Sequence, residues 1–311
     1  MINWALLGSY VLSLLIMIVL PVVLVFLAVK RFKVSWWAVL AGVVAYALFY
    51  LSTMGVDTLL SNGTLPVPPS TWPTVLRIAI FGLVSGLLEE GIRWLAFKLL
   101  GSHAEKFGSA PVLGIAHAGA ESIFYGVLAV GAPLFTYVFY NAGHQIAQGT
   151  PISTVQSMLN NISAFWAQPF YTGLTQGGVS LITLSVQILM AILIWKSITD
   201  RNFLWFVVAV IYEVMLFLFN SYLGQLSLPG YVTIATMFLI LLINVYLSYR
   251  FLSDEMEEEE EDEEDEDDED GEDEDDEDED EDDEVESENT PGLASGDESP
   301  EEQSTEDVQK P

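Results

Sequence analysis

Seven apolar stretches, each about as long as a membrane-spanning helix, constrain this chain most. A helix rises about 1.5 Å per residue, so about 20 apolar residues cross a hydrocarbon layer roughly 30 Å thick. The sequence therefore predicts an all-α, polytopic membrane helix bundle of about seven spans. The fourth stretch is long enough for its outer end to bend at Pro133. The predicted spans are about 5–29, 36–56, 75–100, 111–140, 172–195, 202–222 and 231–251.

Charge divides the chain into two parts. Residues 1–253 hold ten of the eleven Lys and Arg but only seven of the 44 Asp and Glu, and residues 254–311 hold the other 37 acids. A run this acidic repels itself and cannot bury apolar surface. We therefore expect a transmembrane domain at 1–253 and a disordered acidic tail at 254–311. Such a tail excludes nucleic-acid binding and suits a basic protein partner, or else is simply solvated.

Basic residues gather on one side of the membrane when the seven spans alternate in direction. Cytoplasmic loops carry an excess of Lys and Arg. That side is therefore predicted to be cytoplasmic, which puts the N-terminus outside a cell membrane and the tail inside. The basic residues that agree on this side are Lys30, Arg31, Lys33, Lys98, Lys106, Lys196, Arg201 and Arg250.

Ionisable residues inside the predicted spans recur at one depth. An isolated charge at mid-bilayer costs at least about 2.5–3.5 kcal/mol, so buried charges in a membrane are functional by default. Counted from the cytoplasmic ends of their spans, Glu90 and Glu121 lie ten residues in and Glu213 lies eleven in, or roughly 15–17 Å deep. Arg93 and His117 lie seven and six residues in. Three helices thus place ionisable groups in one thin layer.

Spacing along the helices adds to this pattern. His117 and Glu121 are four residues apart, so they share a helix face. Gly82 and Gly86 precede the acidic pair of the third span, and Gly114 and Ala118 flank His117 in the fourth. Small residues let helix backbones approach closely. We therefore expect the third and fourth spans to pack together. Gln187, in the fifth span, falls near the same depth.

The chemistry available in this layer is that of a metal site with a base beside it. Imidazole and carboxylate groups suit zinc, which activates a bound water, and a second carboxylate can act as general base. Arg93 would hold one carboxylate ionised and oriented. The alternative is a buried salt bridge between Arg93 and Glu89, with His117 hydrogen-bonded to a remaining acid.

Two segments, 81–100 (FGLVSGLLEEGIRWLAFKLL) and 114–123 (GIAHAGAESI), resemble the signature segments of the YhfC family of intramembrane metalloproteases. That family is similar in turn to the CAAX prenyl protease and PrsW group. The resemblance implies that Glu89 or Glu90 activates water and that His117 binds metal. It also implies a further His on the fifth or sixth span, which this chain lacks. A zinc site would then be carboxylate-rich, with His117, Glu121 or Glu90, and Glu213 as ligands.

These observations predict a metal-dependent peptidase that cuts peptide bonds in or near the bilayer, with zinc as its metal. Its catalytic residues would be Glu89, Glu90 and Arg93. The alternative is a membrane scaffold or binding protein that keeps the fold without the chemistry, and a transporter is disfavoured because no internal repeat is evident. The expected partners are membrane lipid and a peptide or membrane-protein substrate.

Overall fold

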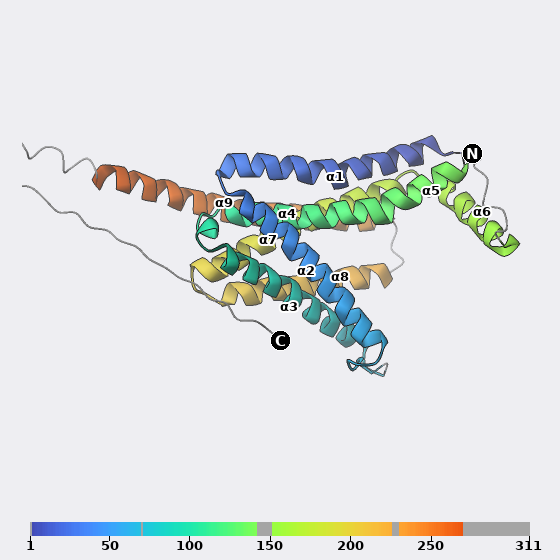
Figure 1. Ribbon diagram of the computed structural model, residues 1–311, viewed down its shortest axis with the longest axis horizontal. Coiled ribbons are helices and arrows are strands. Elements are labelled where there is room, and N and C mark those ends of the chain that lie inside the picture. The colour runs from blue at the N-terminus through green and yellow to red at the C-terminus, as the bar shows by residue number, and fades with distance from the viewer. Residues whose placement is uncertain (1, 70, 142–150, 226–229, 270–311) are drawn as a thin grey trace, which may run out of the picture. The chain divides into compact units, whose positions relative to one another are not determined.

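Helices make up almost all of the residues that the computed structural model describes, which are 2–69, 71–141, 151–225 and 230–269. Two short turns, η1 and η2, interrupt the series of α-helices (Figure 1). The prediction of an all-α membrane protein is confirmed. In chain order the elements are α1 (Trp4–Phe32), α2 (Trp36–Ser61), α3 (Thr74–Leu100), η1 (Gly101–Ala104), α4 (Ser109–Tyr125), η2 (Gly126–Gly131), α5 (Ala132–Asn141), α6 (Ile152–Trp166), α7 (Thr172–Thr199), α8 (Leu204–Gln225) and α9 (Gly230–Glu269).

Within this described part, six helical segments are long and apolar enough to cross a membrane by length and composition. The other predicted span, 75–100, coincides with α3, which is 27 residues long. It differs from the six because it carries Glu89, Glu90 and Arg93 in close succession, and all three are buried. The six segments are Trp4–Phe32, Trp36–Ser61, Ser109–Asn141, Thr172–Thr199, Leu204–Tyr222 and Ile234–Glu255.

The ends of the first helices follow from local capping. The side chain of Asn3 accepts a hydrogen bond from the backbone N–H of Leu6, which satisfies one of the free donors at the start of α1. Lys33 ends α1 in the left-handed region, at φ 52°. Ser35 then caps α2 by accepting from the N–H of Trp37. The chain therefore turns sharply between the first two spans.

The fourth predicted span is interrupted before the residue that was expected to bend it. A π-helical turn, η2, occupies Gly126–Gly131, and Pro133 lies in the first turn of the following helix, α5. Proline has no N–H to donate to the preceding turn and its ring crowds that turn, so a regular α-helix is disfavoured just upstream. The irregularity is therefore one turn earlier than Pro133.

The most deeply buried helices are α4 and α7, and glycines let their neighbours approach closely. A Cβ on Gly42 of α2 would lie 2.5 Å from the Leu113 carbonyl oxygen of α4. A Cβ on Gly114 of α4 would lie 2.7 Å from the Gln187 carbonyl oxygen of α7. These two contacts fix α2, α4 and α7 side by side, with backbones nearly touching.

Small residues on α3 serve a different interface from the one that the sequence suggested. A Cβ on Gly82 would meet the Phe217 ring at 3.0 Å, and a Cβ on Gly86 would meet the Glu213 side chain at 3.4 Å. Both neighbours belong to α8. The prediction that these glycines pack α3 against α4 was therefore wrong, because small residues indicate a close approach without identifying the partner.

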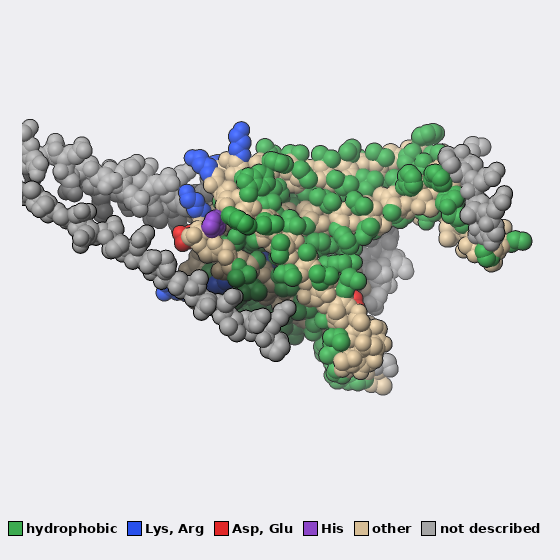
Figure 2. All heavy atoms as spheres, in the orientation of Figure 1, with side chains coloured by type: hydrophobic (Ala, Val, Ile, Leu, Met, Phe, Trp, Pro, Cys, Tyr) green, Lys and Arg blue, Asp and Glu red, His purple; other side chains and the backbone are tan. Residues whose placement is uncertain are grey.

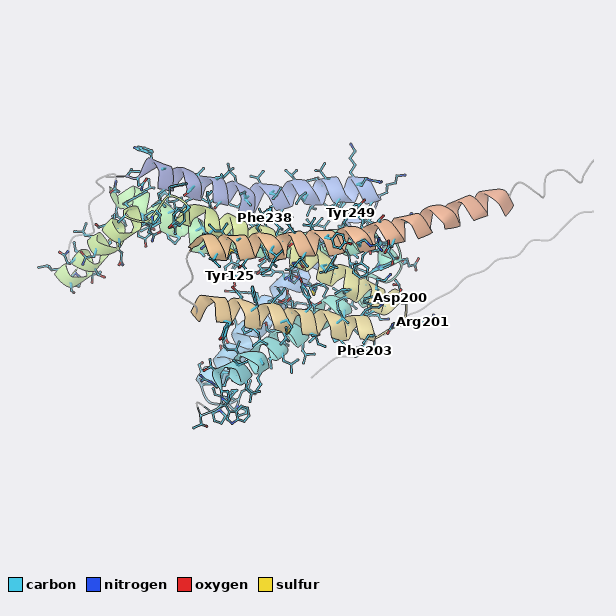
Figure 3. The ribbon with its side chains drawn as sticks, turned by 180° about the vertical axis from the view of Figure 1, so that it is seen from behind. Tyr125, Asp200, Arg201, Phe203, Phe238 and Tyr249 are labelled. Atoms are coloured by element: carbon cyan, nitrogen blue, oxygen red, sulfur yellow. The ribbon has the colours of Figure 1, made fainter. Side chains whose placement is uncertain are left out.

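Apolar side chains cover the flanks of the helices, and Lys and Arg side chains gather at one end of the bundle (Figure 2). That end holds the last turns of α1, α3 and α7, each of which carries a basic residue. Asp200 and Arg201, in the turn between α7 and α8, lie at the same end (Figure 3). This distribution suits a protein whose flanks face lipid and whose basic end faces water.

The chain divides into two compact units, residues 1–261 and residues 262–311. Helix α9 continues to Glu269, whereas the disordered tail was expected to start at Asp254. Glutamate is a good helix former, so a helix does not have to end where a membrane span ends. The expected disorder of 270–311 lies outside the described residues, and the boundary between 253 and 254 stays a prediction.

Candidate active site

Arg93 is at the centre of a buried polar network on α3. Its side chain is 0% exposed, and so is that of Glu90. The Nη1 group of Arg93 donates to Glu90 Oε1, and its Nη2 group donates to Glu89 Oε1 at 3.3 Å. The same Nη2 group donates to Gln187 Oε1 of α7. One guanidinium therefore compensates two carboxylates and joins α3 to α7.

Glu89 Oε1 is the atom on which three helices converge. Besides the Arg93 hydrogen bond, it accepts from Gln187 Nε2 at 2.6 Å. On its other side, the His117 Nε2 atom of α4 lies 3.3 Å away. Gln187 thus bonds to both members of the Glu89–Arg93 pair and holds them in register. The carboxylate of Glu89 is consequently fixed in position by groups from α3, α4 and α7.

A cavity of about 300 Å³ lies beside this network and is partly polar. Glu89, Glu121 and Glu213 all line it, together with Gln187 and Asn220. Its remaining walls are largely apolar side chains of α7, α8 and α9. Such a mixture, an apolar hollow with a few convergent polar groups, is typical of a small-molecule or catalytic site.

The adjacent residues Glu89 and Glu90 have different surroundings. Glu89 lines the cavity, whereas Glu90 does not line it and points its Oε1 atom at Arg93. Neighbouring residues on a helix point about 100° apart, so the two adjacent side chains meet different surroundings here. The arrangement gives Glu89 access to a reactant and leaves Glu90 with a supporting contact.

Several buried polar atoms of the site have no hydrogen-bond partner among the described residues. They include Glu90 Oε2, Glu213 Oε2 and both ring nitrogens of His117. The 3.3 Å contact between His117 and Glu89 is therefore a close approach without hydrogen-bond geometry. Buried polar atoms of this kind are normally satisfied by protein, water or a bound group.

A metal ion is implied by the resemblance, and the donor types suit one. A structural or catalytic zinc takes at least three protein ligands at about 2.0–2.3 Å. Yet within the described residues no group of three or more His, Cys, Asp or Glu side chains is placed to hold a metal. The predicted ligands His117, Glu121 and Glu213 do not fit an ion as they stand. This ligand set therefore stays a prediction.

The structure brings all six predicted site residues into two connected groups. Glu89, Glu90, Arg93 and His117 form the contact network, and Glu121 and Glu213 share the cavity with Glu89.

Sequence reasoning missed Tyr46 of α2. Its ring lies edge-on to the His117 ring, at 5.7 Å between centroids. The Tyr46 hydroxyl is buried and has no partner among the described atoms. A tyrosine in the middle of an apolar span was the available signal, since a buried hydroxyl usually finds a partner.

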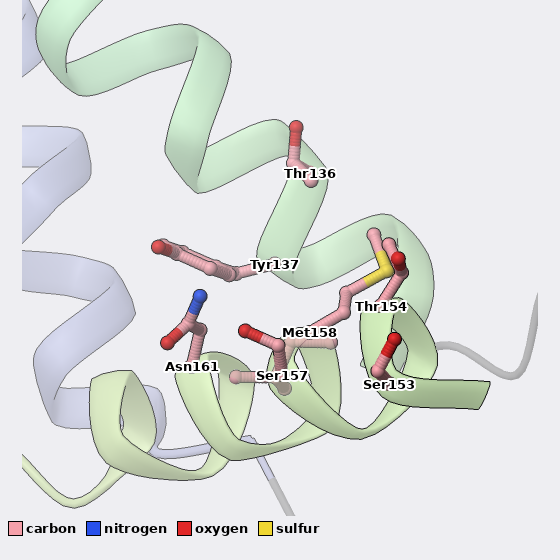
Figure 4. Close-up of a pocket in the computed structure, with 8 residues that line it drawn as sticks. Thr136, Tyr137, Ser153, Thr154, Ser157, Met158 and Asn161 are labelled. Atoms are coloured by element: carbon pink, nitrogen blue, oxygen red, sulfur yellow. The ribbon is translucent and has the colours of Figure 1, made fainter. Parts of the chain in front are cut away.

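A larger hollow, of about 570 Å³, lies between α5 and α6 and contains none of the predicted site residues. Tyr137 of α5 and Ser157 and Asn161 of α6 are among its lining residues (Figure 4). Size alone therefore does not identify the site, because this hollow has hydroxyl and amide groups but no ionisable group able to act as a base near neutral pH.

Comparison with known protein families identifies the family of this chain. The family model described as YhfC intramembrane metalloprotease matches residues 16–240, which is most of the chain and includes every residue of the network and cavity named above. Comparisons with curated proteins and with solved structures give no match.

Proposed function

Because the chain belongs to the YhfC intramembrane metalloprotease family, we propose that it is a multi-pass membrane peptidase that hydrolyses peptide bonds in or near the bilayer. One observation carries this proposal. The carboxylate of Glu89 opens onto a cavity among the spans while Arg93, Gln187 and His117 surround its other side. A fixed carboxylate beside a hollow is what general-base catalysis requires.

In the proposed reaction, Glu89 takes a proton from a water in the cavity. The hydroxide oxygen forms a bond to the carbonyl carbon of the substrate, and the carbon–nitrogen bond then breaks. The proton held by Glu89 passes to the leaving nitrogen, so the carboxylate is regenerated. Arg93 and Gln187 act as positioning residues for Glu89, and Glu90 positions Arg93.

Zinc is the metal that the proposal expects, with His117, Glu121 and Glu213 as ligands. Their oxygen and nitrogen donors suit zinc, and neither ring nitrogen of His117 has a hydrogen-bond partner among the described residues. Metal analysis of the purified full chain tests this part alone. One zinc per chain, lost on His117→Ala, would support it. If wild-type protein cleaves its substrates without any bound metal, the zinc part of the proposal is refuted and only the carboxylate mechanism stands.

The substrate is unknown, so the test of hydrolysis should survey many. We would compare new peptide N-termini, by mass spectrometry, in membranes from cells that produce the wild-type chain or Glu89→Gln. Glutamine is nearly isosteric with glutamate but is a poor base, so cleavages in membrane segments should disappear with the fold retained. A thermal melt of each purified variant controls for folding. The same set of termini in both samples would contradict the proposal.

A second candidate function is a non-catalytic membrane scaffold or binding protein. It is favoured by the way Arg93 engages both Glu89 and Glu90, and by the lack of a three-ligand group among the described residues. In that case Glu89→Gln should leave the set of termini unchanged and should instead alter the thermal stability.

We also propose that the N-terminus lies outside the cell and that the acidic tail is cytoplasmic, where it could meet a basic protein partner. The basic end of the bundle supports this orientation. Protease added to intact cells should leave an epitope at the end of the chain uncut and should remove it after permeabilisation. Loss of the epitope from intact cells would invert the orientation.

A further inference from the structure

Two successive segments of α9 are held very differently, and the second of them, residues 244–255, is fastened to the bundle. Tyr212 of α8 donates to Asn244 Oδ1 at 2.9 Å, and Asn244 is fully buried. The rings of Trp205 and Phe251 meet edge to face at 5.8 Å. Leu247 and Leu252 pack on the main apolar core, and Lys196 of α7 pairs with Glu255. These contacts anchor residues 244–255 of α9.

The preceding segment of α9, residues 234–243, has no such attachment among the described residues. Its described side-chain hydrogen bonds stay within the helix: the Thr236 hydroxyl donates to the Val232 carbonyl, and the Ile240 carbonyl accepts from the Asn244 side chain. The side chain of Phe238 is 58% exposed (Figure 3). Between this segment and α7 lies an apolar groove of about 270 Å³, with Thr175, Gly178 and Ile182 on one wall. We call this the α7–α9 groove.

The α7–α9 groove leads to the candidate site. Ile182 of α7 and Met237 of α9 line both the groove and the cavity that contains Glu89. A second apolar groove, of about 250 Å³ between α2 and α3, has a similar size but shares no lining residue with that cavity. Continuity with the carboxylates therefore distinguishes one groove from another of similar volume and similarly apolar lining.

We propose that the α7–α9 groove receives an apolar membrane-spanning helix of the substrate, which reaches the cavity past Ile182 and Met237. This inference rests on the proposed peptidase function and names its substrate class. No charged residue lines the groove, so it suits a segment that itself spans the bilayer. A Cβ added to Gly178 meets nothing within 4 Å, so the groove wall is open there, and small residues favour close helix packing.

The absence of cysteine from the chain permits a direct binding test. The full chain with Glu89→Gln, so that nothing is cleaved, would carry a single dye on Thr175→Cys in phosphatidylcholine vesicles. The probe is a synthetic Leu/Ala helix of about 20 residues with one Trp that quenches the dye on contact. The matched control carries the dye on Val44→Cys, in the α2–α3 groove.

We expect saturable quenching at Thr175→Cys and only weak, linear quenching at Val44→Cys. Adding Gly178→Phe should fill the groove and abolish the saturable component. Gly55→Phe should leave it unchanged, because Gly55 also has open space around its Cβ but lies on α2. If Gly178→Phe does not fold, Leu181→Trp fills the same groove.

Three results would overturn the inference. Equal quenching at both dye positions would mean that the peptide contacts any lipid-facing surface. Quenching by lipids with brominated chains that the peptide does not displace would assign the groove to lipid. If quenching of the dye at Thr175→Cys rises with the protein-to-lipid ratio in the absence of peptide, the groove binds a second copy of the chain. Saturable binding of the peptide without any cleavage by the wild-type chain would support the groove and count against the peptidase.

Discussion

Replacing Arg93 with Leu should destabilise the protein strongly, because two buried carboxylates would lose their shared partner. Arg93 and Glu90 are 0% exposed and Glu89 is 4% exposed, so water does not screen their interaction. Removing one member of a buried ion pair costs about 3–5 kcal/mol. For a domain of this size each kcal/mol corresponds to roughly 2–4 °C in Tm. The expected fall in Tm is therefore about 6–20 °C.

The same reasoning predicts little change in Tm when Arg93 and both of its carboxylate partners are replaced together. The triple variant Glu89→Leu, Glu90→Leu and Arg93→Leu removes all three members of this ion-pair network, and replacing a buried ion-pair network by apolar groups is often neutral or stabilising. Its Tm should return to within about 4 °C of the wild type. Lys98→Leu is the control, because Lys98 is an exposed cation of the same helix, 5.4 Å from the Trp94 ring.

Thermal unfolding in detergent, followed by near-UV circular dichroism, measures all three variants. An Arg93→Leu protein that melts within about 2 °C of the wild type would refute the idea that the network is held by compensated charge. A triple variant as unstable as Arg93→Leu would also refute it, because the loss would then come from packing around the guanidinium.

Two further changes test the packing of the bundle. Gly42→Ala should cost about 1–3 kcal/mol, since its Cβ would lie 2.5 Å from a carbonyl oxygen of α4, whereas Gly55→Ala in the same helix should be neutral or stabilising by about 0.5–1 kcal/mol. Equal melting of the two proteins would show that α2 and α4 do not touch. Tyr212→Phe should lose about 0.6 kcal/mol with its hydrogen bond to Asn244, measured by unfolding in SDS. A loss above about 2 kcal/mol would mean that the hydroxyl has a larger role.

Depth along the helices could be predicted from sequence because helical rise is nearly constant. Counting residues placed Gln187 near the layer of Glu90 and His117, and the structure has Gln187 bonded to Arg93 and Glu89 in that layer. The direction of a side chain around its helix could not be obtained in this way. It depends on which neighbour each helix packs against, and this is why the sequence left Glu89 and Glu90 equivalent.

The helix that packs against a given small residue could not be predicted from the sequence either. Gly82 and Gly86 indicate a close contact, but the identity of the partner helix is a property of the whole bundle. The same applies to the cavity, since Glu213 reaches it only because α8 packs on the glycine face of α3. The residue types of the site were therefore predictable, whereas their grouping required the packing of four helices.

The π-helical turn at Gly126–Gly131 has a consequence for what comes after it. Such a turn holds one residue more than an α-helical turn, so every later residue takes the angular position that the preceding residue would have in an unbroken α-helix, a shift of roughly 100°. The turn thereby sets the direction of the α5 face that presents Leu134 to α1, relative to the α4 face that carries His117. Deleting one residue within this turn would let it close as a regular α-helical turn, and both faces should keep their partners.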